Sequence, residues 1–292
     1  MALSRRKFLG LLGGAVGAGV VGAGGVVGLD GRLRHKLEDK WAYMDGPDLS
    51  LPSSGAHIVT GTFESRFMHR EVGWAFSLPA TVEPRAIVLS LYGKGADQFA
   101  AFNNLHLPDA AAFVGAPLAI ASADGGRDNY WHRRANGTDA HAMLVEEFVP
   151  LLTSRVGPLP FALHGYSMGG YGVLLAAERG VNAAATSFFK GVAASSPALW
   201  AEPKETATGA FDDAGDFYAN DVFTGVPALR SLSVRLDCGT LDPFYQATRR
   251  LSELMTWPHV AMFRPSATHT SGFWRSVAPA QMRFLADACG VL

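Results

Sequence analysis

The sequence is poor in cysteine and in charge, and both shortages exclude classes of protein. Its 292 residues contain two cysteines, Cys238 and Cys289, which match neither a zinc-site spacing nor the C-x-x-C of a redox pair. They fit either one disulfide or two buried thiols, because geometry decides between the two states. Charged residues make up 17% and the formal net charge is -1. No basic stripe with interleaved aromatic residues is present, which argues against a nucleic acid partner.

Hydrophobic residues, in contrast, make up 48% of the chain. That fraction supplies a large buried core and argues against disorder. The length fits one large domain or two small ones.

The N-terminal residues 1–29 resemble a targeting segment. Arg5 and Arg6 follow Ser4, and residues 9–29 carry no charge. This is the pattern of a twin-arginine export signal, which predicts a secreted or cell-envelope protein that meets the twin-arginine export machinery. Because about 20 apolar residues can span a bilayer, the alternative is an uncleaved membrane anchor. Residues 30–54 indicate a linker, and residues 55–292 are expected to form the main folded domain.

A glycine motif inside that segment resembles a nucleotide-binding loop. Residues 17–22 match G-x-G-x-x-G. Such a fingerprint needs a strand before it and a helix that starts at it. Here two arginines and a uniformly apolar stretch precede it, so we predict no nucleotide site.

Beyond residue 55, apolar runs alternate with helical segments. This alternation predicts an α/β fold with a mostly parallel central sheet and helices on both faces. The chemistry of such sheets lies at the carboxyl ends of the strands. Residues 198–221 show no clear pattern and are expected to form a small cap. The predicted strands are 57–63, 71–78, 86–95, 117–126, 157–167, 188–197, 231–240 and 260–265, and the predicted helices are 139–152, 169–178, 244–255 and 278–288.

One serine lies among closely spaced glycines at a strand-to-helix junction. Gly165-Tyr166-Ser167-Met168-Gly169 has the G-x-S-x-G pattern of a nucleophile elbow. The tight turn holds the serine in a strained conformation, and glycines remove the clashes around it. Ser167 is therefore the predicted nucleophile. The helix that follows Ser167 carries partial positive charge at its N-terminus, so the Met168 N–H can stabilise an oxyanion.

A serine nucleophile needs a histidine base and a carboxylate, in the chain order Ser, acid, His. Only His259 and His269 follow Ser167. His269 lies in a loop before the last helix and is favoured, whereas His259 begins a predicted strand. For the acid, Asp242 in a loop is favoured over Asp237 at a strand end. The acidic residues Asp212, Asp213, Asp216 and Asp221 of the cap are expected to be solvated.

Further site residues surround this triad. Lys94 lies between Gly93 and Gly95, in the loop that ends an earlier strand, and its N–H is the predicted second oxyanion donor. Aromatic residues at the expected rim offer an acyl or sugar subsite, although ordinary loop packing explains them as well. These residues are Tyr92, Tyr130, Trp131 and Trp200. The chemistry requires no metal and no organic cofactor.

Several segments resemble one family. "SLYGKG", "GYSMGGYG", "DCGTLDPF" and "THTSGFW" occur in the order seen in the esterase D-like family of α/β hydrolases, which includes the secreted mycolyltransferase antigens of mycobacteria. The resemblance covers about residue 58 to the C-terminus. It implies an α/β-hydrolase fold, a packing role for Trp274 beside the histidine loop, and the site residues Ser167, Asp242, His269, Lys94 and Met168.

The expected function is hydrolysis of a small-molecule, lipid or glycolipid ester through an acyl-serine intermediate. An acyltransferase that passes the acyl group to a sugar or glycerol hydroxyl is the first alternative. The trehalose-binding residues of the mycolyltransferases have no clear match near Lys94, which favours the esterase. The second alternative is a non-catalytic envelope binding protein, which would have lost part of the triad.

Overall fold

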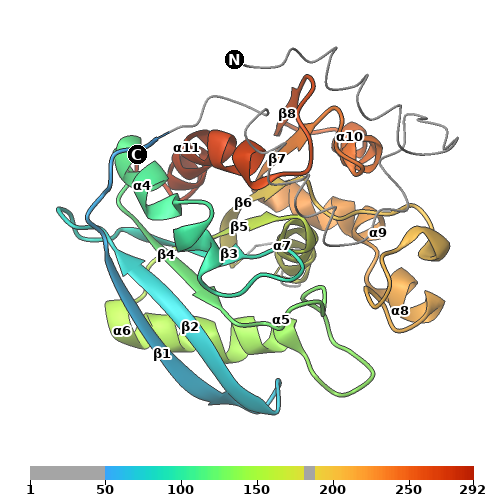
Figure 1. Cartoon of the computed structure of the whole chain (residues 1–292), viewed down its shortest axis with the longest axis horizontal. Coiled ribbons are helices and arrows are strands. Elements are labelled where there is room, and N and C mark those ends of the chain that lie inside the picture. The colour runs from blue at the N-terminus through green and yellow to red at the C-terminus, as the bar shows by residue number, and fades with distance from the viewer. Residues whose placement is uncertain (1–49, 181–187) are drawn as a thin grey trace, which may run out of the picture.

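A single eight-stranded sheet organises the structure, a computed structural model that describes residues 50–180 and 188–292 (Figure 1). The spatial order of the strands is β1-β2-β4-β3-β5-β6-β7-β8. β2 runs antiparallel to β1 and β4, and every later pair is parallel. The predicted mostly parallel sheet is thus confirmed. The strands are β1 His57–Ser65, β2 Arg70–Leu78, β3 Ala86–Leu91, β4 Leu118–Ala123, β5 Phe161–Tyr166, β6 Phe189–Ser195, β7 Ser233–Gly239 and β8 Val260–Arg264.

Helices cover both faces of this sheet. α4 (Leu107–Phe113) and α11 (Ser271–Ala288) pack together on one face, and α6 (Val149–Val156) and α7 (Met168–Arg179) lie on the other (Figure 1). Every residue of β3, β4 and β5 is buried as a result, which explains their largely apolar sequences. The remaining helices are α3 Ala100–Asn103, α5 Ala140–Met143, α8 Ala214–Ala219, α9 Val222–Gly225 and α10 Tyr245–Leu254, with a π-helical turn at Leu144–Phe148 and 3-10 turns at Pro203–Glu205 and Val226–Ser231.

Two of the helices that cover the sheet differ from the prediction. α4 falls in a stretch with no predicted element. α11 begins at Ser271 rather than residue 278, because the Thr270 hydroxyl caps it by accepting a hydrogen bond from the Phe273 N–H at 3.3 Å. This early start places the helix directly after the loop that carries His269. The described residues 50–180 and 188–292 contain no helix long and apolar enough to cross a membrane.

The predicted signal or anchor, with its glycine motif, lies outside the described residues, as do all but the last five residues of the predicted linker.

A buried polar chain joins the sheet to α11. The His164 ring on β5 is 1% exposed; its Nε2 donates to Gln281 Oε1 at 3.2 Å, and its Nδ1 accepts from the Ser90 hydroxyl at 3.1 Å. Both contacts suit the neutral imidazole. Burial lowers the pKa of His164 to about 4, although the Gln281 hydrogen bond acts in the opposite direction.

The low pKa of His164 predicts acid lability. The unfolded chain, with an ordinary histidine pKa of about 6.5, binds this proton more tightly than the folded protein. The free energy of unfolding is therefore expected to fall by about 3 kcal/mol from this group as the pH drops from 6.5 toward 4. Urea unfolding at pH 7 and pH 4.5 measures it. The loss should be smaller in His164→Asn, and an equal loss in both proteins would contradict the assignment.

Candidate active site

The turn between β5 and α7 holds Ser167 in an unusual backbone conformation. Its φ is 54° and its ψ is -122°, a region that costs a non-glycine residue about 1–3 kcal/mol. A Cβ on Gly165 would lie 2.3 Å from the Gly169 carbonyl oxygen, and one on Gly169 would lie 1.9 Å from the Leu91 carbonyl oxygen. Only glycine fits at either position. The turn therefore presents Ser167 at the carboxyl edge of the sheet and at the start of α7.

Ser167, His269 and Asp242 form a hydrogen-bonded chain. The His269 Nε2 atom lies 2.8 Å from Ser167 Oγ, and its Nδ1 atom lies 2.8 Å from Asp242 Oδ2. A carboxylate only accepts, so Nδ1–H donates to Asp242 and Nε2 is free to accept the Ser167 proton. This arrangement can turn a serine hydroxyl into a nucleophile.

The Asp242 carboxylate is fully buried in the loop after β7. Burial raises the pKa of this carboxyl, but the His269 ring and a 2.8 Å hydrogen bond from the Phe244 N–H outweigh it and hold the pKa below its usual value. Asp242 therefore stays ionised and fixes the His269 ring through Nδ1.

Two aromatic rings pack against the His269 imidazole. Phe244 meets the His269 ring at a centroid distance of 5.3 Å and Trp274 meets it at 5.0 Å, both edge-on. The packing role expected for Trp274 is confirmed by this contact.

The alternative acid and base take other partners. The His259 ring contacts the Ser252 hydroxyl at 2.8 Å and the Trp257 carbonyl oxygen at 2.9 Å. Asp237 accepts two hydrogen bonds from Arg235, at 2.7 and 2.8 Å, on the buried part of β7. The structure therefore brings His269 and Asp242, rather than His259 and Asp237, to the serine.

The residues that carry the two predicted oxyanion donors lie in segments next to Ser167. Met168 is the first residue of α7, where backbone N–H groups have no partner within the helix. The loop that carries Lys94 passes beside the serine, since a Cβ on Gly93 would lie 3.2 Å from Ser167 Cβ. The Lys94 side chain is turned to the cap, where Nζ donates to the Thr208 carbonyl oxygen at 3.1 Å. The oxyanion roles of both N–H groups stay predictions.

Three of the four predicted rim aromatics lie in the interior. Tyr92, Tyr130 and Trp131 are 1%, 3% and 1% exposed, so the expected rim position is wrong for them. The Tyr92 hydroxyl donates to Asp124 Oδ1 at 2.9 Å, and the Trp131 ring packs on the Tyr92 ring at 5.0 Å. These contacts support loop packing. Trp200, half-buried, packs against Phe244, which in turn contacts His269; its contact with substrate stays a prediction.

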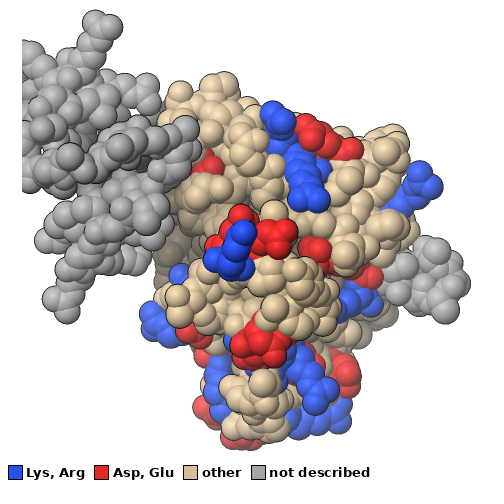
Figure 2. Space-filling model, turned by 90° about the vertical axis from the view of Figure 1, so that its right-hand side faces the viewer, with Lys and Arg blue, Asp and Glu red and all other residues tan. Residues whose placement is uncertain are grey.

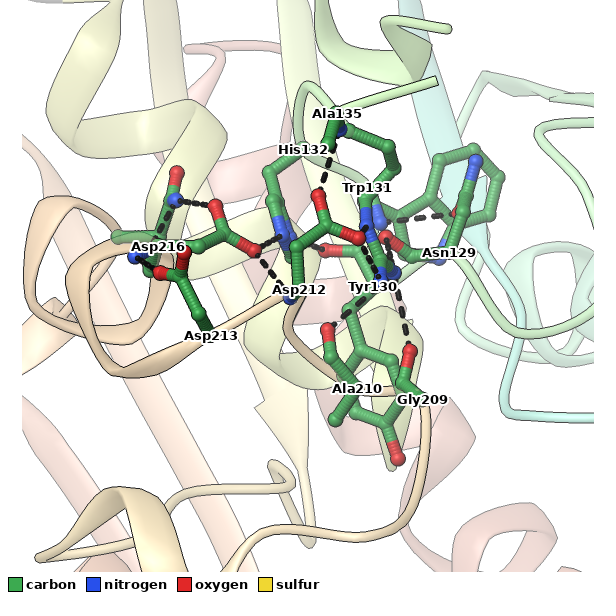
Figure 3. A network of polar contacts seen from close by, with 12 residues as sticks. Asn129, Tyr130, Trp131, His132, Ala135, Gly209, Ala210, Asp212, Asp213 and Asp216 are labelled. Atoms are coloured by element: carbon green, nitrogen blue, oxygen red, sulfur yellow. Dashed lines mark hydrogen bonds and ion pairs between the residues drawn. The ribbon is translucent and has the colours of Figure 1, made fainter.

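A polar network connects the cap to the loop of residues 129–135 (Figure 3). Arg134 donates to Asp212 Oδ1 at 2.8 and 3.2 Å and to the Gly209 carbonyl oxygen at 3.0 Å. The buried His132 ring lies 3.1 Å from Asp216 Oδ2. Burial lowers the pKa of His132, and the Asp216 carboxylate opposes this shift.

The sequence predicts that the four cap carboxylates are only solvated. The structure shows that all four also accept hydrogen bonds from the protein. Asp213 and Asp221 cap α8 and α9 by accepting from the N–H groups of Asp216 and Phe223, at 2.8 and 2.9 Å. Asp212 and Asp216 anchor the cap.

Loss of the Arg134 guanidinium is expected to loosen the cap. Arg134→Ala removes charge-assisted hydrogen bonds to a carboxylate and to a backbone carbonyl and should lower stability by about 1–3 kcal/mol. Arg134→Lys should keep only part of the stability that Arg134 provides, because a lysine cannot reproduce the planar, forked guanidinium. Limited proteolysis within residues 203–219 and thermal unfolding measure the effect. Cleavage of Arg134→Ala at the wild-type rate would contradict this role.

Within the described residues, the cysteines, the possible metal-binding side chains and the cavity beside α4 give no sign of a second site. Cys238 and Cys289 are both free thiols. Within residues 50–180 and 188–292, no cluster of three His, Cys, Asp or Glu side chains could hold a metal ion. A cavity of about 130 Å³ opens between β2 and α4, and no triad residue lines it.

Comparisons with known proteins agree with this fold. An S-formylglutathione hydrolase from Agrobacterium tumefaciens superposes with a TM-score of 0.67 at 17% identity, covering 82% of this chain and 98% of its own. FphF, a fluorophosphonate-binding serine hydrolase of Staphylococcus aureus, gives 0.63 at 17% identity, with coverage of 79% and 98%. MPT51 of Mycobacterium tuberculosis gives 0.62 at 16% identity, with coverage of 80% and 99%. At these identities the likeness shows the fold, which is that of an α/β hydrolase.

No curated protein matches the chain by sequence. A family model, "Putative esterase", matches residues 66–270, which is more than two thirds of the chain and includes Ser167, Asp242 and His269. The chain therefore belongs to this esterase family.

Proposed function

We propose that the protein is an exported serine esterase that cleaves carboxylic esters through an acyl-serine intermediate. The observation that carries the proposal is the continuous chain of 2.8 Å hydrogen bonds from Ser167 through His269 to Asp242. Ser167 attacks the ester carbonyl, and His269 takes its proton and returns it to the leaving alcohol. Water, activated by the same histidine, then releases the acid.

The oxyanion of each tetrahedral intermediate would form between the Lys94 and Met168 N–H groups. Loss of one such donor costs about 3 kcal/mol of transition-state stabilisation. The catalytic chain needs no metal, because the histidine moves the proton and backbone groups hold the charge.

The surface near the cap supports an uncharged substrate. Figure 2 looks at the side of the molecule that carries α8 and α10, and its visible described surface mixes basic and acidic side chains with broad uncharged areas. No large area of one sign is seen there that would attract an ion. An uncharged small-molecule, lipid or glycolipid ester suits this surface.

An acyl-chain series tests this function. The protein should hydrolyse p-nitrophenyl esters, assayed from acetate to octanoate, with and without added trehalose or glycerol. Release of free acid with no new ester supports the esterase. A new ester of the added alcohol would identify the acyltransferase instead, and a folded protein that cleaves none of the esters would be a binding protein.

The twin-arginine segment supports export. Replacing both Arg5 and Arg6 by lysine is expected to leave the protein in the cytoplasm, because the paired arginines are the feature that the export machinery reads. Cell fractionation of the two forms measures it. Equal export of both would contradict the proposed route.

A further inference from the structure

Ser196, at the end of β6, combines complete burial with a strained backbone. It is 0% exposed and has a φ of 45°, in the left-handed region that a residue with a side chain seldom adopts. Its N–H donates to the Asp237 carbonyl oxygen at 2.7 Å, which ties this turn to β7. The neighbouring strand β7 leads directly into the loop of Asp242. A strained serine held next to the Asp242 loop suggests that its hydroxyl has a role at the triad.

The hydroxyl of Ser196 hydrogen-bonds three side chains at the triad, those of Trp274, Asp242 and Cys238. It accepts a hydrogen bond from Trp274 Nε1–H at 3.1 Å and bonds to the Asp242 carboxylate. The direction of both bonds follows from chemistry, since an indole N–H only donates and a carboxylate only accepts. The hydroxyl proton of Ser196 therefore goes to Asp242.

Trp274 also contacts the histidine of the triad, His269. Its ring packs edge-on against His269 at a centroid distance of 5.0 Å. It also lies 4.4 Å from the ring of Tyr166, the residue before Ser167. One indole thus contacts the base through its ring and the acid through the Ser196 hydroxyl.

We propose that Ser196 is a positioning residue of the triad, which orients the Asp242 carboxylate and couples it to Trp274. The inference rests on the proposed esterase function and deepens it. The donated hydrogen bond spreads part of the carboxylate charge and fixes which oxygen faces His269. The buried Cys238 also lies beside Asp242; burial and the Asp242 charge both raise the pKa of its thiol, so it remains neutral.

The variants Ser196→Ala and Ser196→Gly test this role. Both remove the hydroxyl, and the glycine also relieves the positive φ, so a folding defect in the alanine variant does not decide the outcome. We expect kcat for p-nitrophenyl acetate to fall about tenfold in both, with KM within about twofold. Without the Ser196 donor, the carboxylate attracts the imidazolium more strongly, so His269 stays protonated to higher pH. The acid limb of kcat/KM should therefore move up by about half a pH unit.

Two further variants sharpen the comparison. Ser195→Ala is the matched control, because the adjacent Ser195 hydroxyl is equally buried but accepts from Gln281 Nε2 at 2.8 Å and should leave the acid limb in place. Trp274→Phe keeps a ring on His269 but removes the indole N–H, and should shift the limb in the same direction by less.

The outcomes separate the two proposals. An active wild-type enzyme whose Ser196 variants keep the wild-type acid limb, with or without a loss of rate or stability, overturns the positioning role and leaves the esterase intact. A wild-type protein that neither cleaves esters nor reacts with a fluorophosphonate overturns the esterase, and the positioning role with it.

Discussion

Ser167→Ala is expected to lower kcat for p-nitrophenyl acetate by about 10⁴- to 10⁶-fold, the range seen when a serine nucleophile is removed. The reason is that the acyl-enzyme cannot form, and only the oxyanion donors and substrate binding remain. The fold should survive, since the substitution removes one half-buried hydroxyl at the protein surface. Steady-state rates and the thermal unfolding midpoint of the variant measure both effects.

Ser252→Ala is a matched control for this experiment. Ser252 also places its hydroxyl 2.8 Å from a histidine Nε2, that of His259, but this pair contacts no triad residue. Ser252→Ala should keep the wild-type rate. Comparable losses in the two variants, or a Ser167→Ala protein with more than a few per cent of wild-type activity, would contradict the assignment of the nucleophile.

Asp242→Asn is expected to lower kcat by about 10⁴-fold with little change in the fold. An amide of the same shape can present N–H instead of oxygen to His269, which then donates rather than accepts at Nε2. The base is lost although its ring stays in place. The pH dependence of kcat and the unfolding midpoint are the measurements.

Asp237→Asn should show the reverse pattern. Asp237 is ion-paired with Arg235 in the interior, so the substitution leaves an uncompensated buried guanidinium and should lower the free energy of unfolding by about 3 kcal/mol. Its kcat should stay within about tenfold of wild type. A rate loss in Asp237→Asn larger than that in Asp242→Asn would mean that the acid has been misassigned.

The triad was predictable because its parts leave local marks in the sequence. Glycines at 165 and 169 are the only residues that the turn around Ser167 admits, so the strain is visible as a motif. The order of acid and base along the chain then reduced the choice to two histidines and two aspartates.

Other parts of the site depend on how loops fold over the sheet, and the sequence carries little sign of that. Tyr130 and Trp131 both have positive φ, at 54° and 59°, which turns their side chains into the interior. Aromatic residues seldom adopt this conformation, so a rim position was the natural expectation. The role proposed for Ser196 depends on contacts with residues 46 and 78 positions away, which no local pattern records.

The most direct test of the central claim is to locate the adduct that a fluorophosphonate forms with the folded wild-type protein. The tryptic peptide of residues 156–179 contains a single serine, Ser167, which makes the assignment by mass spectrometry unambiguous. The hydrogen-bonded chain to His269 and Asp242 predicts that this peptide carries the phosphonyl group and that acid denaturation before labelling abolishes the adduct. An adduct on a different serine, or none on the folded protein, would contradict it.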